Sequence, residues 1–136
     1  MKENRTIDQF CSLTPLNEET KPPQYPTPYS AFIYLYGLSE SSPGVFVDRH
    51  PLAPARAIKE LRTNLLVNQL HPAVIPLVST PLKLKDLSII TLSAELEEGK
   101  ELRVTIESFR HDSINLSHGD PIAIIQFIRA LKIDGD

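Results

Sequence analysis

Cysteine, tryptophan and long apolar runs are scarce in this 136-residue chain, and each scarcity excludes a class of protein. The chain has one cysteine, Cys11, and no tryptophan. A single cysteine cannot form an internal disulfide, so we expect a protein of a reducing compartment, cytoplasmic, nuclear or both. Apolar runs reach about six residues, far short of the ~20 that cross a bilayer, so no membrane partner is expected.

A strong charge of one sign is also missing. The net charge of -3 gives no electrostatic reason to bind nucleic acid. The four histidines are His50, His71, His111 and His118, and none has a metal-ligand spacing with Cys11. We therefore expect no nucleic-acid partner, no metal site built from side chains and no resident cofactor.

Proline is abundant, with twelve residues against five glycines. Prolines spread this widely disfavour long helices and favour short strands and loops. Residues 1–28 are polar and proline-rich, and we predict an N-terminal arm there, followed by one β-domain over residues 29–136. The arm is either a plain connector or a polyproline II ligand for a partner.

Period-2 patterns place several strands. Apolar and polar residues alternate over residues 101–108, as in a strand with one buried face. Residues 118–121, HGDP, predict a turn, and the apolar run 122–127 is typical of a strand buried on both faces. We also expect strands at 45–47, 73–77 and 87–92, and a lysine-protected edge strand at 82–85.

Residues 55–70 are ambiguous. Ala57, Leu61 and Leu65 suit one face of a helix, with Lys59 and Glu60 on the exposed side. The same stretch, taken as Ala57-Ile58 followed by residues 62–67, also resembles two short strands around a turn, and we prefer the strands.

Four blocks of the sequence, in order, resemble the dUTPase family. Residues 119–123, GDPIA, resemble the family's G-D-R-I-A turn and strand, and residues 30–36, SAFIYLY, resemble its S-A-G-[YF]-D-L-[YF] block. Residues 78–82, VSTPL, stand in the place of its R-S-[SG]-x-A block, and residues 93–101, SAELEEGKE, stand in that of G-V-I-D-x-D-Y-R-G-E. The resemblance implies an all-β fold: a distorted antiparallel jelly-roll or β-barrel with short strands and little helix. It also implies that the strand at 122–127 pairs with the one at 31–36.

The resemblance implies a nucleotide site as well. Glu95 takes the place of the carboxylate that activates water. Ser79, Thr80, Gly119 and Gln126 take places close to the substrate. Mg²⁺ is expected only if the chain is an active dUTPase, because the metal then acts with the substrate's phosphates.

The charged groups of that site are mostly replaced. Val78 stands where the family has the arginine of its phosphate block, and Pro121 and Ile124 replace the arginine and glutamine of G-D-R-I-A-Q. Residues 128–136 contain no Arg-Gly-Gly-Phe-Gly segment of the kind that covers the nucleotide. We therefore expect a pseudoenzyme, a dUTPase-related protein without catalysis.

Such relatives occur in DNA viruses, where they act as accessory proteins that engage host factors. Host or cellular proteins are therefore the expected partners, and the family implies a homotrimer. Two alternatives remain open. One is a divergent dUTP pyrophosphatase with Glu95 as base, and the other is an unrelated jelly-roll structural subunit.

Overall fold

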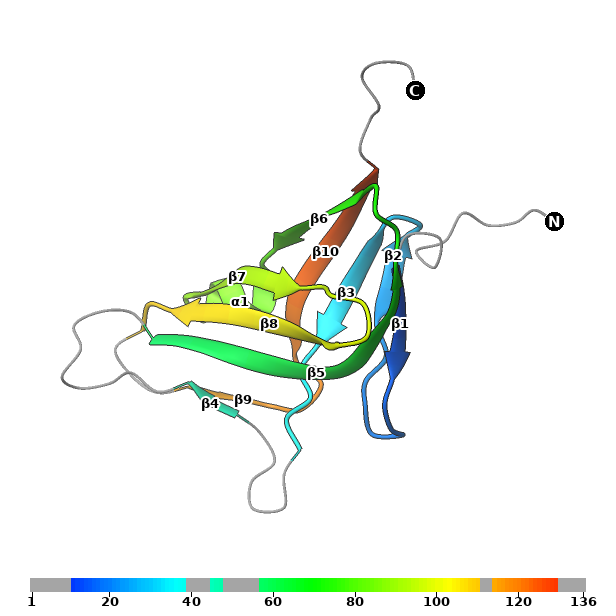
Figure 1. The fold of residues 1–136 in the computed structure, drawn as a ribbon. Helices are drawn as coiled ribbons and strands as arrows, with labels where there is room; N and C mark the ends of the chain where they lie inside the picture. Colours follow the sequence, from blue (N-terminus) through cyan, green and yellow to red (C-terminus); the bar gives the residue numbers. More distant parts are fainter. Residues whose placement is uncertain (1–10, 39–44, 48–56, 111–113, 130–136) are drawn as a thin grey trace.

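The computed structural model describes residues 11–38, 45–47, 57–110 and 114–129, and these ranges form an all-β fold with one short helix (Figure 1). Two four-stranded antiparallel sheets enclose the core. Sheet I has the order β1-β5-β8-β7, with β1 Cys11–Pro15, β5 Ala57–Leu70, β8 Glu101–Ser108 and β7 Ile89–Glu95. Sheet II has the order β2-β3-β10-β6, with β2 Gln24–Thr27, β3 Ser30–Tyr34, β10 Pro121–Arg129 and β6 Val74–Ser79. β4 (Val45–Val47) pairs with β9 (Ile114–Leu116), and α1 spans Leu82–Asp86.

The predicted all-β class with little helix is confirmed, and so are the strands at 45–47, 73–77, 87–92 and 101–108, within a few residues at their ends. No helix in the described ranges is long and apolar enough to span a membrane.

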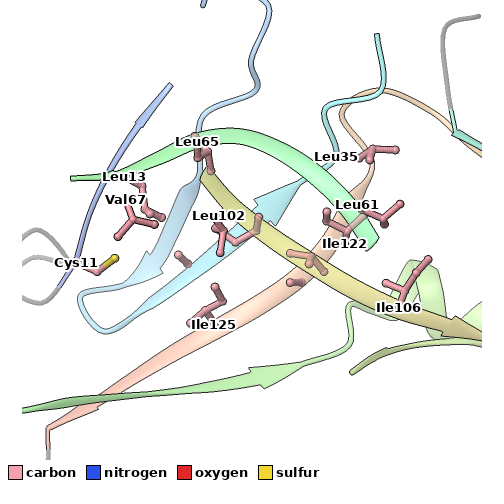
Figure 2. Close-up of a cluster of buried hydrophobic side chains, with 14 of the residues drawn as sticks. Cys11, Leu13, Leu35, Leu61, Leu65, Val67, Leu102, Ile106, Ile122 and Ile125 are labelled. Atoms are coloured by element: carbon pink, nitrogen blue, oxygen red, sulfur yellow. The ribbon is translucent and has the colours of Figure 1, made fainter. Parts of the chain in front are cut away.

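Alternating residues of the two sheets build the core. In β8, the side chains of Leu102, Val104 and Ile106 are fully buried, as their period-2 pattern predicts. Ile33 of β3 and Ile125 of β10 approach from sheet II. Figure 2 shows side chains from both sheets, with Ile122 and Ile125 beneath β8 and Leu61 and Leu65 on β5, converging on one apolar cluster.

β10 lies between β3 and β6, and its pairing with β3 tests the main prediction about topology. Ile125 pairs with Ala31, and Ala123 pairs with Ile33, so the predicted pairing of residues 122–127 with 31–36 is confirmed. The expectation that β10 is buried on both faces is wrong for this single chain. Gln126 is exposed and Ile128 is 41% exposed on the outer side, because no element of the described chain covers that face.

β5 resolves the ambiguous region as strand, in one piece of fourteen residues. The two strands predicted around a turn are a single strand with a bulge, where the register to β8 shifts between Arg62 and Leu66. Asn64 in this bulge has φ 56°, a left-handed conformation that asparagine tolerates better than most side chains. Its backbone N–H donates to a carboxylate oxygen of Glu101 at 2.8 Å, and the Thr63 hydroxyl donates to the Leu102 carbonyl at 2.7 Å.

Residues 82–86 form helix α1 where the sequence predicted an edge strand. Pro81, at φ -63°, precedes the helix, and its carbonyl accepts hydrogen bonds from the N–H groups of Leu84 and Lys85. Leu84 is fully buried and Leu82 is 72% exposed. The short leucine–lysine alternation was misleading because four residues cannot distinguish a strand from one helical turn.

Residues 11–28 fall in the predicted N-terminal arm, and they contribute strands to both sheets. β1 pairs with β5, and β2 pairs with β3. Cys11 is fully buried and Leu13 is 8% exposed, so this segment is attached to the core. The division of the chain at residue 28 stays a prediction, and residues 1–10 lie outside the described ranges.

Candidate functional site

Ser79 and Thr80 lie where β6 ends and the chain turns towards α1. Ser79 is exposed and pairs with Ile124 of β10. The Thr80 hydroxyl oxygen accepts a hydrogen bond from the Thr91 N–H at 2.9 Å, and the Thr91 hydroxyl donates to the Ile122 carbonyl at 2.7 Å. Thr80 therefore helps to join β7 to sheet II.

Gly119 lies in the turn before β10, and this turn is close to α1. Gly119 has φ 89°, which explains the glycine. The turn is closed by Asp120, whose carboxylate accepts from the Ser117 N–H at 2.8 Å. The ammonium of Lys83, on α1, forms an ion pair with Asp120 at 2.7 Å. The Ser79–Thr80 segment and the Gly119 turn therefore lie at the same end of sheet II.

Lys21 is a second cation at this turn, and the sequence analysis did not single it out. A Cβ built on Gly119 would lie 3.6 Å from Cδ of Lys21, so the lysine stem covers the glycine. The Lys21 ammonium lies 4.1 Å from the centre of the Tyr34 ring, a cation–π contact. Burial raises the pKa of the Tyr34 hydroxyl above its ordinary value, and that hydroxyl donates to the side-chain oxygen of Gln24.

His118 has a structural role that its sequence neighbours do not reveal. Its Nδ1 accepts from the Gly37 N–H at 3.1 Å, and its Nε2 contacts the Glu19 carbonyl at 2.7 Å. These bonds require the neutral ring with its proton on Nε2. Tyr36 packs edge-on against the ring, with centroids 5.4 Å apart. The sequence predicted only a turn here, because the bonding partners of His118 lie 81 and 99 residues away.

Glu95 does not lie beside the other candidate residues in this chain. It is the last residue of β7, exposed and paired with Arg103 of β8. Thr91, which contacts Thr80, is four residues earlier on β7. Because a strand rises ~3.3 Å per residue, Thr91 and Glu95 are about 13 Å apart. A single chain therefore does not assemble Glu95 with Ser79 and Thr80.

The loop after Glu95 is attached to β5 by its backbone. The Gly99 N–H donates to the Val67 carbonyl at 2.7 Å, and the Val67 N–H donates to the Lys100 carbonyl at 2.9 Å. A carboxylate oxygen of Glu98 accepts from the Leu70 N–H at 2.8 Å. These acidic residues form no metal site, since the described ranges contain no group of three or more His, Cys, Asp or Glu side chains that could hold an ion.

At the positions where the resemblance expects two arginines and a glutamine, this chain has apolar side chains that are partly buried. Val78 pairs with the fully buried Ile125 and packs against the core. Ile124 and Pro121 are half-buried on β10. Gln126, predicted to contact substrate, is exposed on the outer face of sheet II, opposite Leu77 and Ser30. The partly buried side chain at position 78 is apolar and cannot form an ion pair with a phosphate oxygen.

No family model matches this sequence, and no curated protein matches it. Several solved structures, however, match the fold of this chain. A variant of the dUTPase from phage phi11 of Staphylococcus aureus, described with the coordination of a structural Mg(II) ion, superposes with a TM-score of 0.67 at 9% identity. The match covers 93% of this chain and 94% of the phage protein.

The dUTPase of Staphylococcus bacteriophage 80alpha, solved with dUpNHpp, superposes with a TM-score of 0.63 at 10% identity, over 93% of this chain and 86% of the phage protein. A variant of the 80alpha enzyme gives 0.65 at 9% identity, over 93% and 94% of the two chains. Identities this low carry no information about chemistry, but the coverage spans nearly the whole of each chain. The chain therefore has the all-β fold of the dUTPases.

Proposed function

We propose that this chain is a non-catalytic protein on a dUTPase scaffold and that it acts through protein–protein interaction. The observation that carries this proposal is the apolar, partly buried side chain of Val78, which packs against the core at the position where the resemblance requires a phosphate-binding arginine. Pro121 and Ile124 remove two further polar contacts near the same place. The fold is retained, whereas the charged and polar groups that would contact the phosphates are replaced.

The size of the expected loss is large. Removal of one preorganised donor from a charge-stabilising site costs ~3 kcal/mol of barrier, or about 100-fold in rate. Glu95 adds a methylene group where the resemblance expects aspartate, and a displacement of ~1 Å can cost another 100-fold. Losses of this kind together leave little hydrolysis of dUTP.

A regulatory role for this fold has a precedent among the structural neighbours. The 80alpha dUTPases are described as controlling the transfer of virulence genes by a proto-oncogenic G protein-like mechanism. By analogy, we assign this chain to viral accessory proteins that engage host factors in the cytoplasm or nucleus. The single buried cysteine supports a reducing compartment.

Isothermal titration with dUpNHpp and Mg²⁺ tests the loss of the nucleotide site. We expect no binding heat from this chain, with the 80alpha dUTPase as the positive control, since that enzyme was solved with dUpNHpp. Saturable binding at micromolar concentrations would overturn the proposal.

A divergent dUTP pyrophosphatase is the second candidate, and one observation favours it. The Lys83 ammonium pairs with Asp120 in the Gly119 turn, and the Lys21 stem lies against Gly119 with its ammonium over Tyr34, so two lysines lie at this end of sheet II. In this alternative, Mg²⁺ is held by the substrate's phosphates and water, because the described residues offer no ligand cluster. Glu95→Gln would then abolish turnover with binding retained, whereas Lys83→Gln would weaken binding.

A further inference from the structure

The segment that leads through β2 to the start of β3 has a repeating pattern of three residues. Residues 21–30 read KPPQYPTPYS, with a polar residue at every third position and two proline or tyrosine residues between successive polar ones. The polar positions are Lys21, Gln24, Thr27 and Ser30. A polyproline II helix has three residues per turn, so residues three apart lie on the same side of it. The pattern therefore predicts one polar side and two sides made of proline and tyrosine.

The polar side of this segment is attached to β3. The Lys21 ammonium lies 4.1 Å from the centre of the Tyr34 ring, and the side-chain oxygen of Gln24 accepts from the Tyr34 hydroxyl. The hydroxyls of Thr27 and Ser30 are 2.6 Å apart and share a hydrogen bond. In the register of β2 to β3, Gln24 and Thr27 have partners, and the register is irregular between these two positions. The contacts with β3 therefore recur with the period of three that the sequence predicts.

The proline and tyrosine residues between the polar positions are accessible. Tyr25 is 42% exposed and Tyr29 is 46% exposed. Of the four prolines, Pro23 is half-buried, and the exposed ones are Pro22, Pro26 and Pro28. β2 is an edge strand of sheet II, and Figure 1 shows it at the end of that sheet, beyond β3. A partner can therefore reach the proline and tyrosine side chains while the segment stays attached to β3.

Protection of the sheet edge accounts for only part of this composition. Proline on an edge strand prevents other strands from pairing with it, and this role explains Pro26, which lies within β2 and has no N–H to donate. It does not explain Pro22 and Pro23, which precede β2, or the exposed side chains of Tyr25 and Tyr29. Tyrosine is enriched in the contact surfaces between proteins. Exposed tyrosines among prolines therefore indicate a recognition site.

One stretch of four residues in this segment has the sequence Pro-Pro-x-Tyr, formed by Pro22, Pro23, Gln24 and Tyr25. In a polyproline II helix, Pro22 and Tyr25 are one turn apart on the same side, about 9 Å along the axis at ~3.1 Å per residue. The residue between the prolines and the tyrosine is Gln24, whose side chain is bonded to Tyr34. Domains of the WW type bind proline-rich ligands of this conformation in an aromatic-lined groove.

We propose that residues 22–25 are a docking site for a partner domain of the WW type, whose groove binds the side formed by Pro22 and Tyr25. Pro23 and Pro26 have the Pro-x-x-Pro spacing that SH3 domains bind, but Pro23 is half-buried, whereas Pro22 and Tyr25 are both exposed. The attachment to β3 restricts the segment before it binds, which lowers the entropic cost of association. The inference rests on the proposed protein-interaction role, for which it names a site and a class of partner.

Isothermal titration of the full chain with a purified WW domain that binds Pro-Pro-x-Tyr peptides tests the proposal. A ligand of four residues buries much less than the ~800 Å² per partner of a standard interface, so we expect a Kd on the order of 10–100 μM. Pro22→Ala and Tyr25→Ala each remove one of the two side chains that enter the groove, and we expect either change to weaken binding at least ~10-fold. An SH3 domain in place of the WW domain should give no binding heat.

Tyr29→Ala is the matched control. Tyr29 is the same type of residue as Tyr25, lies in the same segment and is exposed to nearly the same extent, at 46% against 42%. The residues before it, Pro26-Thr27-Pro28, do not form a Pro-Pro-x sequence, so its replacement should leave the Kd unchanged. Equal thermal unfolding of all variants excludes misfolding as the cause of a loss of binding.

Three outcomes would overturn the proposal. They are no binding of the WW domain by the unmodified chain at ~1 mM, tighter binding of the SH3 domain than of the WW domain, and an equal loss of binding in Tyr25→Ala and Tyr29→Ala. The titrations contain no nucleotide, so a failure here is distinct from a failure of the proposed loss of the nucleotide site, which dUpNHpp titration decides.

Discussion

The bulge at Asn64 supports a quantitative prediction about the stability of sheet I. Asn64 is 4% exposed and has φ 56°. Its Nδ2 donates to the Thr20 hydroxyl at 2.7 Å, and its Oδ1 accepts from an Arg62 NH2 group at 3.1 Å. Substitution of this residue perturbs the backbone conformation and the side-chain bonds separately, so a pair of variants can distinguish the two effects.

The magnitudes follow from the two contributions. Asn64→Gly keeps the freedom to adopt positive φ and loses the two side-chain hydrogen bonds, each worth ~1 kcal/mol, so we expect about 2 kcal/mol of destabilisation. Asn64→Ala loses the same bonds and also strains the backbone by about 1–2 kcal/mol, which gives 3–4 kcal/mol in total. Asn64→Val should be worse still, because a β-branched side chain is poorly tolerated at positive φ.

Urea unfolding followed by circular dichroism measures these differences, provided that the slopes of the transitions are equal. We expect the order of stability Asn, Gly, Ala, Val. An alanine variant as stable as the glycine variant would refute the reasoning, because it would show that the positive φ at position 64 carries no energetic cost.

Two further predictions concern α1 and sheet II. Leu84→Ala should lower the free energy of unfolding by about 2–5 kcal/mol, because Leu84 is fully buried. Leu82→Ala should change it very little, because Leu82 is 72% exposed. Similar losses in the two variants would support the edge strand instead of the helix. Burial raises the pKa of Tyr34, so in the folded state the neutral hydroxyl persists to a higher pH than in the unfolded chain. The stability that Tyr34 contributes is therefore complete below its ordinary pKa near 10 and declines as the pH rises above that value. Urea unfolding at several pH values tests this. Above pH ~10, the free energy of unfolding should fall less in Tyr34→Phe than in the unmodified chain. An equal fall in both proteins would show that Tyr34 is not the group responsible.

Patterns with a local physical cause could be predicted from the sequence. β8 alternates because one of its faces is buried, and the pairing of β10 with β3 followed from the order of the dUTPase-like blocks. The left-handed conformation of Asn64 could not be predicted in this way. Its conformation depends on Glu101 and Thr20, which are distant in sequence and come together only when sheet I forms.

The candidate site was harder to predict than the fold. Ser79, Thr80 and Gly119 lie at one end of sheet II, but Glu95 lies elsewhere on the same chain, and their predicted contacts with substrate stay predictions. The contribution of Lys21 was missed because cation–π contacts have no fixed sequence spacing. The apolar run of β10 indicated cover on both faces, whereas Gln126 and Ile128 are exposed in the part of the chain that the structure describes.

The central claim is that a dUTPase fold persists here without dUTPase chemistry, and pyrophosphate release from dUTP tests it most directly. With Mg²⁺ present and the phage phi11 dUTPase measured in parallel, we expect this chain to release no more pyrophosphate than buffer does. Turnover at an ordinary enzymatic rate, ~1 s⁻¹ or faster, that disappears in Glu95→Gln would contradict the account.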